Sequence, residues 1–395
     1  MITRRRVIAG STGALLLAGM AGRAFGAGTA AGDELVALPG KRPLIKRSFR
    51  PPNFETPFAD LRRQYTANDA FFVRYHLASI PEVDARTWRL RVGGASTKRA
   101  LELSLDDLKR NFERVSLAAV NQCSGNRRGL FTPRAGGVQW TYGAMGNAIW
   151  GGVRLRDVLN RAGVSGDALE LVLDGADQQV LPATPDFVKS LPVDRALDEH
   201  TLIAFEMNGA PLPHWNGAPA RLVVPGWTAT YWVKHLTSIR VEPKAFDGFW
   251  MKSAYRIPTG KFPGARFASQ ENAETTPITE ILINSLVTSH VNGDRLQRGR
   301  PAEIAGWAWD GGSGINAVEI SLDEGRSWRQ TTLSEAPSPY SWRGFRWALD
   351  TSKAGPLRVS VRATGRNGAR QPEQLTPNPA GYHHNIIQTL TLEVA

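Results

Sequence analysis

The chain contains one cysteine, Cys123, within the segment Gln122–Arg128, which reads Gln-Cys-Ser-Gly-Asn-Arg-Arg. The mainly apolar run at 115–120 predicts a buried strand, and the Ser-Gly-Asn turn would end that strand at the cysteine. Loops at strand ends are where rigid scaffolds present reactive groups. Because Arg127 and Arg128 follow directly, nearby guanidinium groups favour the thiolate, which binds soft metals or attacks electrophiles. The alternative from the residues alone is a buried structural cysteine.

Charged side chains suited to anion chemistry occur at two other predicted strands. Arg74 and His76 lie in the strand-like segment 71–76, where a solvated edge strand is the alternative. Asp177 follows the predicted strand 169–173, and an ordinary turn aspartate would explain it equally well. These positions are therefore candidates for a site only if the fold brings them together.

Two cations and a tyrosine further along the chain are additional candidates. Arg221 begins the apolar run Arg221–Pro225, where a guanidinium would suit a buried phosphate, and Lys234 follows a tryptophan-rich turn. On spacing alone, both would be ordinary surface cations. Tyr255 would be one more loop aromatic, unless it faces a metal site, where its phenol could hydrogen-bond an oxyanion and relay a proton.

The segment around Cys123 resembles the molybdenum-ligand segment of the sulfite oxidase family, whose members usually carry Cys-Ala-Gly-Asn-Arg-Arg there. Three further segments match that family in the same order: Phe-Phe-x-Arg-x-His at 71–76, the pterin-binding segment at 216–227, and the substrate-pocket tyrosine at Tyr255. The resemblance covers nearly the whole chain after residue 40.

This resemblance implies one molybdenum on a pyranopterin dithiolene, with the Cys123 thiolate as the protein's ligand to the metal. It implies catalytic roles for Tyr255, Arg74, Arg128 and His76, and the two arginines would hold the oxygens of the substrate anion. The implied cofactor-binding residues are Phe71, Phe72, Arg74, Tyr75, Cys123, Asp177, Asn216, Arg221, Trp232 and Lys234.

The sequence departs from the family pattern at three places. Many relatives have asparagine where this chain has Tyr75, and some have histidine where it has Asn216. Where many relatives place an arginine near the mouth of the active site, this chain has His383 and His384. We expect these two histidines to be solvated loop residues.

The resemblance also implies an activity and its partners. Sulfite would be oxidised to sulfate, and the electrons would leave to a separate c-type cytochrome. A chain with one cysteine cannot hold haem through a Cys-x-x-Cys-His motif, so we expect no haem in this chain. The second domain of the family forms dimers, which predicts a homodimer or a heterodimer with a haem subunit.

Length and pattern predict two domains in the 395-residue chain. The predicted class is α+β: a mixed α+β molybdopterin-binding domain of sulfite oxidase type at 41–270, followed by an immunoglobulin-like β-sandwich at 275–395. Short alternating runs separated by Gly-rich turns indicate the sandwich. Residues 28–60 are expected to be a loop-like lead-in and residues 61–68 a short helix.

Local signals predict two further helices in the first domain. Ser104 caps a helix that begins at Leu105. A loop at 151–154 leads into an amphipathic helix that ends at Gly163.

Residues 1–27 read as a twin-arginine export signal, with a basic start, a short apolar run and small residues before residue 28. This predicts a periplasmic protein that folds around its cofactor before export and keeps no stable membrane anchor. The net charge of +12 favours small anions or an acidic protein partner, and the dispersed cations disfavour nucleic acid.

Two rival functions remain open on the sequence. One is a related molybdenum oxidoreductase that acts on nitrate or a sulfoxide, which substrate assays would separate from a sulfite enzyme. The other is a non-enzymatic exported binding protein, which metal analysis would detect. The export signal and the Cys-Ser-Gly-Asn-Arg-Arg segment both disfavour these rivals.

Overall fold

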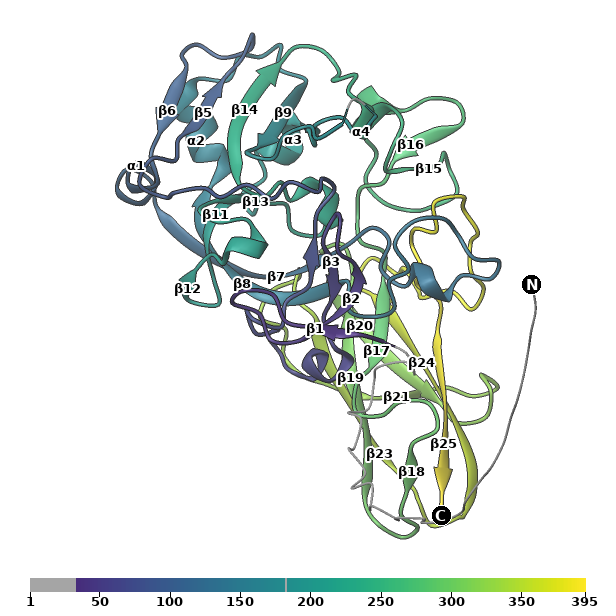
Figure 1. The fold of residues 1–395 in the computed structure, drawn as a ribbon. Helices are drawn as coiled ribbons and strands as arrows, with labels where there is room; N and C mark the ends of the chain where they lie inside the picture. The colour runs from purple at the N-terminus through teal and green to yellow at the C-terminus, as the bar shows by residue number, and fades with distance from the viewer. Residues whose placement is uncertain (1–32, 182) are drawn as a thin grey trace, which may run out of the picture.

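The computed structural model describes residues 33–181 and 183–395, and the predicted export signal at 1–27 lies outside them. Figure 1 shows a broad sheet-rich body, coloured purple to green, above a narrower body of long strands, coloured green to yellow, that ends at the C-terminus. No helix within the described residues has the length and apolar character needed to cross a bilayer.

The chain after residue 33 forms an antiparallel sheet with the strand order β1-β2-β3-β4. Its strands are β1 Leu35–Val36, β2 Leu44–Ser48, β3 Asn53–Glu55 and β4 Val73–Arg74. The prediction of a loop-like lead-in at 28–60 is therefore wrong over these strands. Pairing of Phe54 with Val73 gives β3 a partner that is distant in sequence, which local composition does not reveal.

Residues 61–68 do not form the predicted short helix. A 3-10 helix spans Phe58–Arg62 instead, and the chain beyond it turns and bends. Phe58 and Leu61 are buried in an apolar cluster with Trp309 of the second body. This distant contact, rather than local helix propensity, sets the conformation of the segment.

Two larger sheets form the core of the first body. One has the order β10-β9-β14-β5-β6, and its strands are β5 Leu90–Gly93, β6 Leu101–Leu103, β9 Glu170–Gly175, β10 Lys189–Pro192 and β14 Leu236–Glu242. The other has the order β12-β11-β8-β7 with β13 beside β11, and its strands are β7 Arg114–Gln122, β8 Met145–Arg154, β11 Leu202–Met207, β12 Ala210–Pro211 and β13 Arg221–Val223. Their apolar side chains share one buried cluster, so the two sheets are packed together.

The predicted strand at 115–120 lies within β7, whose last five residues are buried, so the strand before Cys123 is confirmed. β7 pairs along its whole length with β8, from Arg114 opposite Val153 to Gln122 opposite Met145. This long pairing fixes the end of β7, and with it the position of Cys123.

The helices are short and lie beside the sheets. They are α1 Leu105–Asn111, α2 Leu155–Ala162, α3 Val193–Ala196 and α4 Phe249–Lys252. The predicted cap of α1 is confirmed, since Ser104 and Asp107 form a reciprocal capping box. The predicted helix that ends at Gly163 is confirmed as α2, but the loop expected at 151–154 is the end of β8. The sequence predicts a mixture of helix and strand, and in the described structure strands make up most of it.

The second body consists of two sheets that face each other across a common apolar core. One has the order β17-β19-β23-β22, with β17 Asn284–Val287, β19 Ala302–Trp309, β22 Thr332–Leu333 and β23 Arg343–Leu349. The other has the order β18-β25-β24-β20-β21, with β18 Arg295–Leu296, β20 Ile315–Ser321, β21 Arg329–Gln330, β24 Gly355–Gly365 and β25 Gln388–Val394. The alternating runs in the sequence correspond to β19, β20, β23, β24 and β25. A hairpin of β15 Arg256–Pro258 and β16 Thr275–Pro277 precedes this body.

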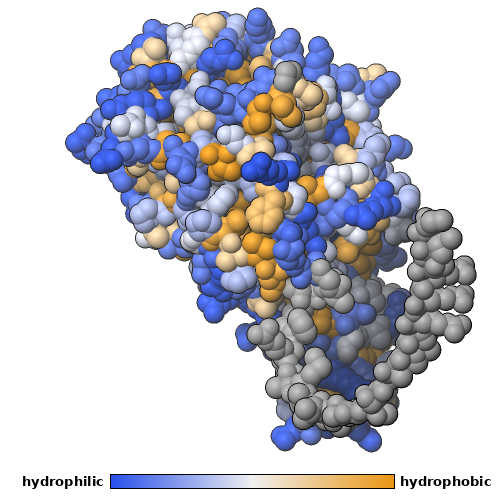
Figure 2. Space-filling model, in the orientation of Figure 1, coloured by the Kyte–Doolittle hydropathy of each residue, from blue (hydrophilic) through white to orange (hydrophobic). Residues whose placement is uncertain are grey.

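The two bodies are joined beside Cys123. Arg127 is 1% exposed, and its guanidinium donates to Asn284 Oδ1 at 2.7 Å and to the carbonyl of Ser285 at 2.9 Å, both on β17. Trp309 Nε1 donates to Gln122 Oε1 at 2.8 Å. The loop that carries the cysteine is therefore fixed from both bodies. Figure 2 shows one face of the molecule, on which hydrophilic residues predominate and apolar residues gather toward the middle of the first body.

Candidate active site

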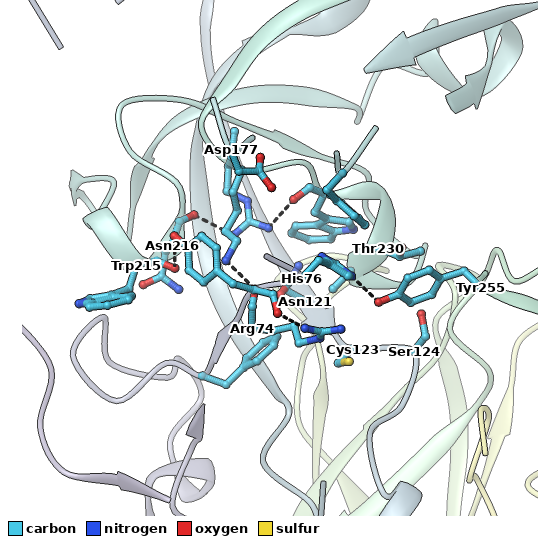
Figure 3. Close-up of a pocket in the computed structure, with 17 residues that line it drawn as sticks. Arg74, His76, Asn121, Cys123, Ser124, Asp177, Trp215, Asn216, Thr230 and Tyr255 are labelled. Carbon is cyan, nitrogen blue, oxygen red and sulfur yellow. Dashed lines mark hydrogen bonds between the residues drawn. The ribbon is translucent and has the colours of Figure 1, made fainter. Parts of the chain in front are cut away.

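One pocket brings together most of the residues that the sequence singles out. It encloses about 660 Å³ of space unfilled by protein atoms, open solvent included. The predicted residues that line it are Phe72, Arg74, Tyr75, His76, Cys123, Asp177, Asn216, Arg221, Trp232, Lys234 and Tyr255. Figure 3 shows these side chains converging from several strands and loops.

Cys123 lies at the end of β7, where its backbone N–H donates to the carbonyl of Ala144 at 2.9 Å. The thiol is free and 6% exposed, and it lines the pocket. Arg127, just beyond the turn, has a left-handed backbone with φ of 67°, which directs the following chain away. The cysteine is thus presented at a strand end, as the sequence indicates.

Arg128 does not line this pocket. Its guanidinium donates to the carbonyl of Ala380 at 2.8 Å and to that of Val138 at 3.2 Å, and it lies over the ring of Tyr382 at 5.1 Å. Arg127 is directed into the second body. The sequence predicts that the guanidinium groups of Arg127 and Arg128 lie beside the Cys123 thiol. In the structure, neither of these arginines lines the pocket.

His76 and Tyr255 form a hydrogen-bonded pair between the imidazole Nε2 and the phenol oxygen. Burial, with Arg74 second, holds the pKa of His76 well below its ordinary value, so the imidazole is neutral. Burial raises the pKa of Tyr255, so the phenol keeps its proton. Arg74 lines the same end of the pocket and donates to Asn53 Oδ1 at 3.2 Å. This end combines a thiol, a guanidinium and a proton-carrying pair.

The other end of the pocket is cationic. Arg221 is 4% exposed and donates to the carbonyls of Asn216 at 2.9 Å and Trp232 at 2.8 Å. Lys234 Nζ donates to the carbonyl of Arg74 at 2.6 Å. Burial lowers the pKa of Arg221 to about 9 and that of Lys234 well below its usual value. Among the described residues, neither cation has a carboxylate within 4 Å, so this end is suited to an anion.

The remaining predicted residues frame this cationic end. Burial raises the pKa of Asp177 to about 6. The hydroxyl of Tyr75 lies 2.7 Å from His235 Nε2. Phe71 does not line the pocket: its ring stacks on Phe72, and its carbonyl accepts a hydrogen bond from Lys41. Phe71 therefore supports the wall rather than forming it.

The residues fit a molybdenum pyranopterin. No group of three or more His, Cys, Asp or Glu side chains that could hold a metal occurs at the described positions, so a metal beside Cys123 needs further ligands from outside the protein. A dithiolene supplies such sulfur ligands. Three buried polar groups that line the pocket, Asn121 Nδ2, Ser124 Oγ and Thr230 Oγ1, have no hydrogen-bond partner in the protein. A polar heterocycle with a phosphate would satisfy these groups and the cations.

Some residues near the site were missed or misjudged from the sequence. His383 and His384 are 7% and 8% exposed, so the expectation of solvated loop residues is wrong. They are buried because His383 packs on Phe262 and His384 on Phe131. Phe187, which lines the pocket, was not singled out, because only its tertiary contacts distinguish it from other apolar residues.

Comparison with protein families places this site in a known class. The family described as Oxidoreductase molybdopterin binding domain matches residues 76–250, and that described as Mo-co oxidoreductase dimerisation domain matches residues 275–394. The pocket and both matches therefore define a molybdopterin-binding oxidoreductase.

Individual relatives narrow the class further. Human mitochondrial sulfite oxidase is 34% identical over 359 residues, covering 87% of this chain, and the chain spans 64% of the length of the human protein. Sulfite oxidase from Gallus gallus is 32% identical over 359 residues, covering 87% of this chain and 76% of that protein. Nitrate reductase [NADH] 1 from Oryza sativa is 30% identical, with 89% of this chain and 40% of that protein covered. The chain belongs to the sulfite oxidase family of molybdenum enzymes, which confirms the resemblance seen in the sequence.

Among solved structures, the sulfane dehydrogenase SoxCD from Paracoccus pantotrophus matches with a TM-score of 0.72 at 26% identity. The match covers 88% of this chain and 88% of that chain. It extends over both bodies, so the sheet-rich first body and the second body follow one another as they do in that enzyme.

Proposed function

We propose that this protein oxidises sulfite to sulfate at a molybdenum pyranopterin centre. The observation that carries the proposal is a single pocket in which the free thiol of Cys123, the guanidinium of Arg74 and the His76–Tyr255 pair lie beside a cationic end. The similarity to the sulfite oxidases of human and chicken supports sulfite as the substrate.

When bound, the cofactor would supply the two-electron oxidation of the substrate sulfur. Cys123 would hold the metal as a thiolate. Arg74 would bind the oxygens of sulfite, because planar guanidinium donors match oxyanions in geometry. The phenol O–H of Tyr255 would donate to Nε2 of neutral His76 while the phenol oxygen accepts a hydrogen bond from the attacking water, so the pair would relay a proton from that water to the imidazole. Arg128, which is held by two carbonyl groups, would contribute positive charge rather than a direct contact.

The cationic end would hold the phosphate of the pterin. Arg221 and Lys234 supply the charge, and Asn216, Trp232 and Asp177 line the same space. Because Arg221 is buried and, among the described residues, its guanidinium donates hydrogen bonds only to carbonyl groups, a phosphate would provide the anionic partner that it lacks.

We further propose that residues 1–27 direct export by the twin-arginine route, and that the enzyme works in the periplasm with a c-type cytochrome as its electron acceptor. Residues 41–270 would form the catalytic domain. Residues 275–395 would form an immunoglobulin-like domain that mediates a homodimer or contact with a haem subunit. The dimerisation-domain match supports this role for the second body.

The test uses protein exported with its own signal, analysed for molybdenum and assayed for sulfite-dependent reduction of cytochrome c. We expect stoichiometric molybdenum and turnover. Cys123→Ser is the matched variant, because it keeps the side-chain size while removing the sulfur ligand, and it should lose turnover. Folded, exported protein without molybdenum would overturn the enzyme proposal. Molybdenum without sulfite turnover would keep the cofactor and discard the substrate.

A second substrate class, sulfane sulfur bound to other sulfur atoms, is favoured by one observation. The structural match over 88% of this chain is with a sulfane dehydrogenase. Parallel assays with sulfite and thiosulfate would separate the two, since the preferred substrate has the higher kcat/KM.

A further inference from the structure

Two side chains from one short segment contact both members of the His76–Tyr255 pair. The ring of Phe187 stacks on the imidazole of His76, with centroids 3.6 Å apart and planes 8° from parallel. Two residues later, at the start of β10, Lys189 places its Nζ 5.3 Å from the ring centroid of Tyr255. The two side chains come from positions 187 and 189, so a single segment contacts both partners.

Lys189 is completely buried, and within the described chain it forms no ion pair. Its Nζ donates to the carbonyl of Trp250 at 2.7 Å and also lies 4.8 Å from the ring centroid of Tyr231. Burial lowers the pKa of Lys189 well below its usual value, because an ammonium there loses its hydration for few contacts, so enclosing this lysine is costly to the fold. Packing alone therefore does not explain why a lysine lies beside the ring of Tyr255.

Trp250 connects the two contacts. Its indole N–H donates to the carbonyls of Pro185 at 3.1 Å and Asp186 at 2.8 Å, which lie just before Phe187. Its ring meets His76 edge to face, with centroids 5.0 Å apart. The side chain of Trp250 thus connects the segment 185–189 to the imidazole of His76. Its carbonyl accepts from Lys189, which ties the same segment to the chain just before Tyr255.

The backbone of Tyr255 provides an independent observation. Its φ of 59° is in the left-handed region, which is uncommon for a bulky residue and is a strained conformation. The carbonyl of Tyr255 accepts from the N–H of Ile278 at 2.9 Å, and its ring stacks on Tyr382 with centroids 5.8 Å apart. Such strain persists where the surrounding structure holds a residue in place, and it is found at functional sites.

We propose that Phe187, Lys189 and Trp250 are positioning residues that hold the His76–Tyr255 hydrogen bond in place for proton transfer at the substrate site. Phe187 fixes the plane of the imidazole, Lys189 supports the phenol ring from behind, and Trp250 ties the two supports together. This inference deepens the proposed function and rests on it for the role of the proton.

The first test reads the hydrogen bond itself and needs no substrate. Protein labelled with 15N-histidine gives ring-nitrogen signals, and the signal of His76 is assigned by its loss in His76→Gln. Tyr255→Phe defines its position without the hydrogen bond. In Phe187→Leu and in Lys189→Met, we expect the Nε2 signal to move from the wild-type position toward the Tyr255→Phe position. An unmoved signal in both variants would overturn the proposal.

The second test separates positioning from general packing. Phe187→Leu and Lys189→Met should lower kcat by roughly tenfold or more with little change in KM, since misplaced catalytic groups slow the chemical step. Lys189→Arg should restore much of the rate, because it keeps a donor for the carbonyl of Trp250. Phe267→Leu is the matched control, since it removes a ring that is 1% exposed and that packs against Trp227 instead of His76. Equal losses in Phe267→Leu and Phe187→Leu would contradict a specific role.

The two tests also distinguish this inference from the proposed function. A protein that does not oxidise sulfite but shows the expected movement of the 15N signal would keep the positioning role and discard the substrate. A protein that oxidises sulfite with unchanged kcat in both positioning variants would keep the function and discard the positioning role.

Discussion

The pH dependence of stability tests whether burial lowers the pKa of Lys41, which lies behind this pocket. Its side chain is 7% exposed, and its Nζ donates to the carbonyls of Asn68 at 2.6 Å and Phe71 at 3.0 Å and to Asn216 Oδ1 at 2.7 Å. It therefore joins Asn216, which lines the pocket, to the backbone behind it. Burial lowers the pKa of Lys41 from 10.5 to about 7, with a smaller opposing effect from Asp69.

The sign of the pH dependence follows from this direction. Above about pH 7 the folded protein has begun to release the Lys41 proton, whereas the unfolded chain keeps it until about pH 10.5. Stability therefore rises with pH across that window, at a limiting rate of about 1.4 kcal/mol per pH unit. Between about pH 7.5 and about pH 9.5, Lys41 should add roughly 2 kcal/mol to the free energy of unfolding.

The assay is urea unfolding of cofactor-free protein, followed by tryptophan fluorescence, at the two ends of that range. In Lys41→Met, the rise attributable to Lys41 should disappear, and the variant should be less stable than wild type at the higher pH, because the two N–H groups of the neutral amine no longer serve the buried acceptors around it. Lys46→Met is the control, since Lys46 lies on β2 and pairs with Glu34 near the surface. Parallel pH curves for wild type and Lys41→Met would refute the reasoning and show that Lys41 stays protonated in the fold.

Three further predictions concern the ends of the pocket. Arg74→Gln should raise the KM for sulfite by roughly tenfold to a hundredfold, the value of one charge-assisted contact; an unchanged KM would remove Arg74 from substrate binding. Lys234→Met should lower the molybdenum content of folded protein, measured per chain by elemental analysis, because a phosphate contact is lost. Gly217→Ala should do the same, since Gly217 has φ of 105° and an added Cβ would lie 2.8 Å from Lys234 Cβ. If it acts by displacing Lys234, the double variant should lose no more molybdenum than Lys234→Met alone.

Local signals in the sequence predicted local structure well. The capping box at Ser104 and the buried stripe of α2 depend on neighbours within one or two turns, and both appear as expected. Arg221 was expected at the start of a buried strand, and it begins β13. The resemblance then supplied most of the pocket, because the matching segments carry the lining residues with them.

Features that depend on distant parts of the chain could not be predicted. The direction of Arg128 is set by the carbonyl of Ala380, and the burial of His383 by Phe262, in each case from a segment far along the chain. Lys41 and Lys189 read as ordinary cations in sequence, yet the fold encloses both. No periodicity or motif marks a lysine whose surroundings come from several separate strands and loops.

The contact between Arg127 and β17 limits how the two bodies of related enzymes can be exchanged in chimeras. The residue four positions after Cys123 inserts its guanidinium into β17, so Asn284 and Ser285 form part of the support of the cysteine loop. A chimera that exchanges the second body between relatives must keep an acceptor side chain at position 284 and the carbonyl of residue 285 within reach of that guanidinium. The second body therefore contributes to the presentation of Cys123 as well as to its own fold.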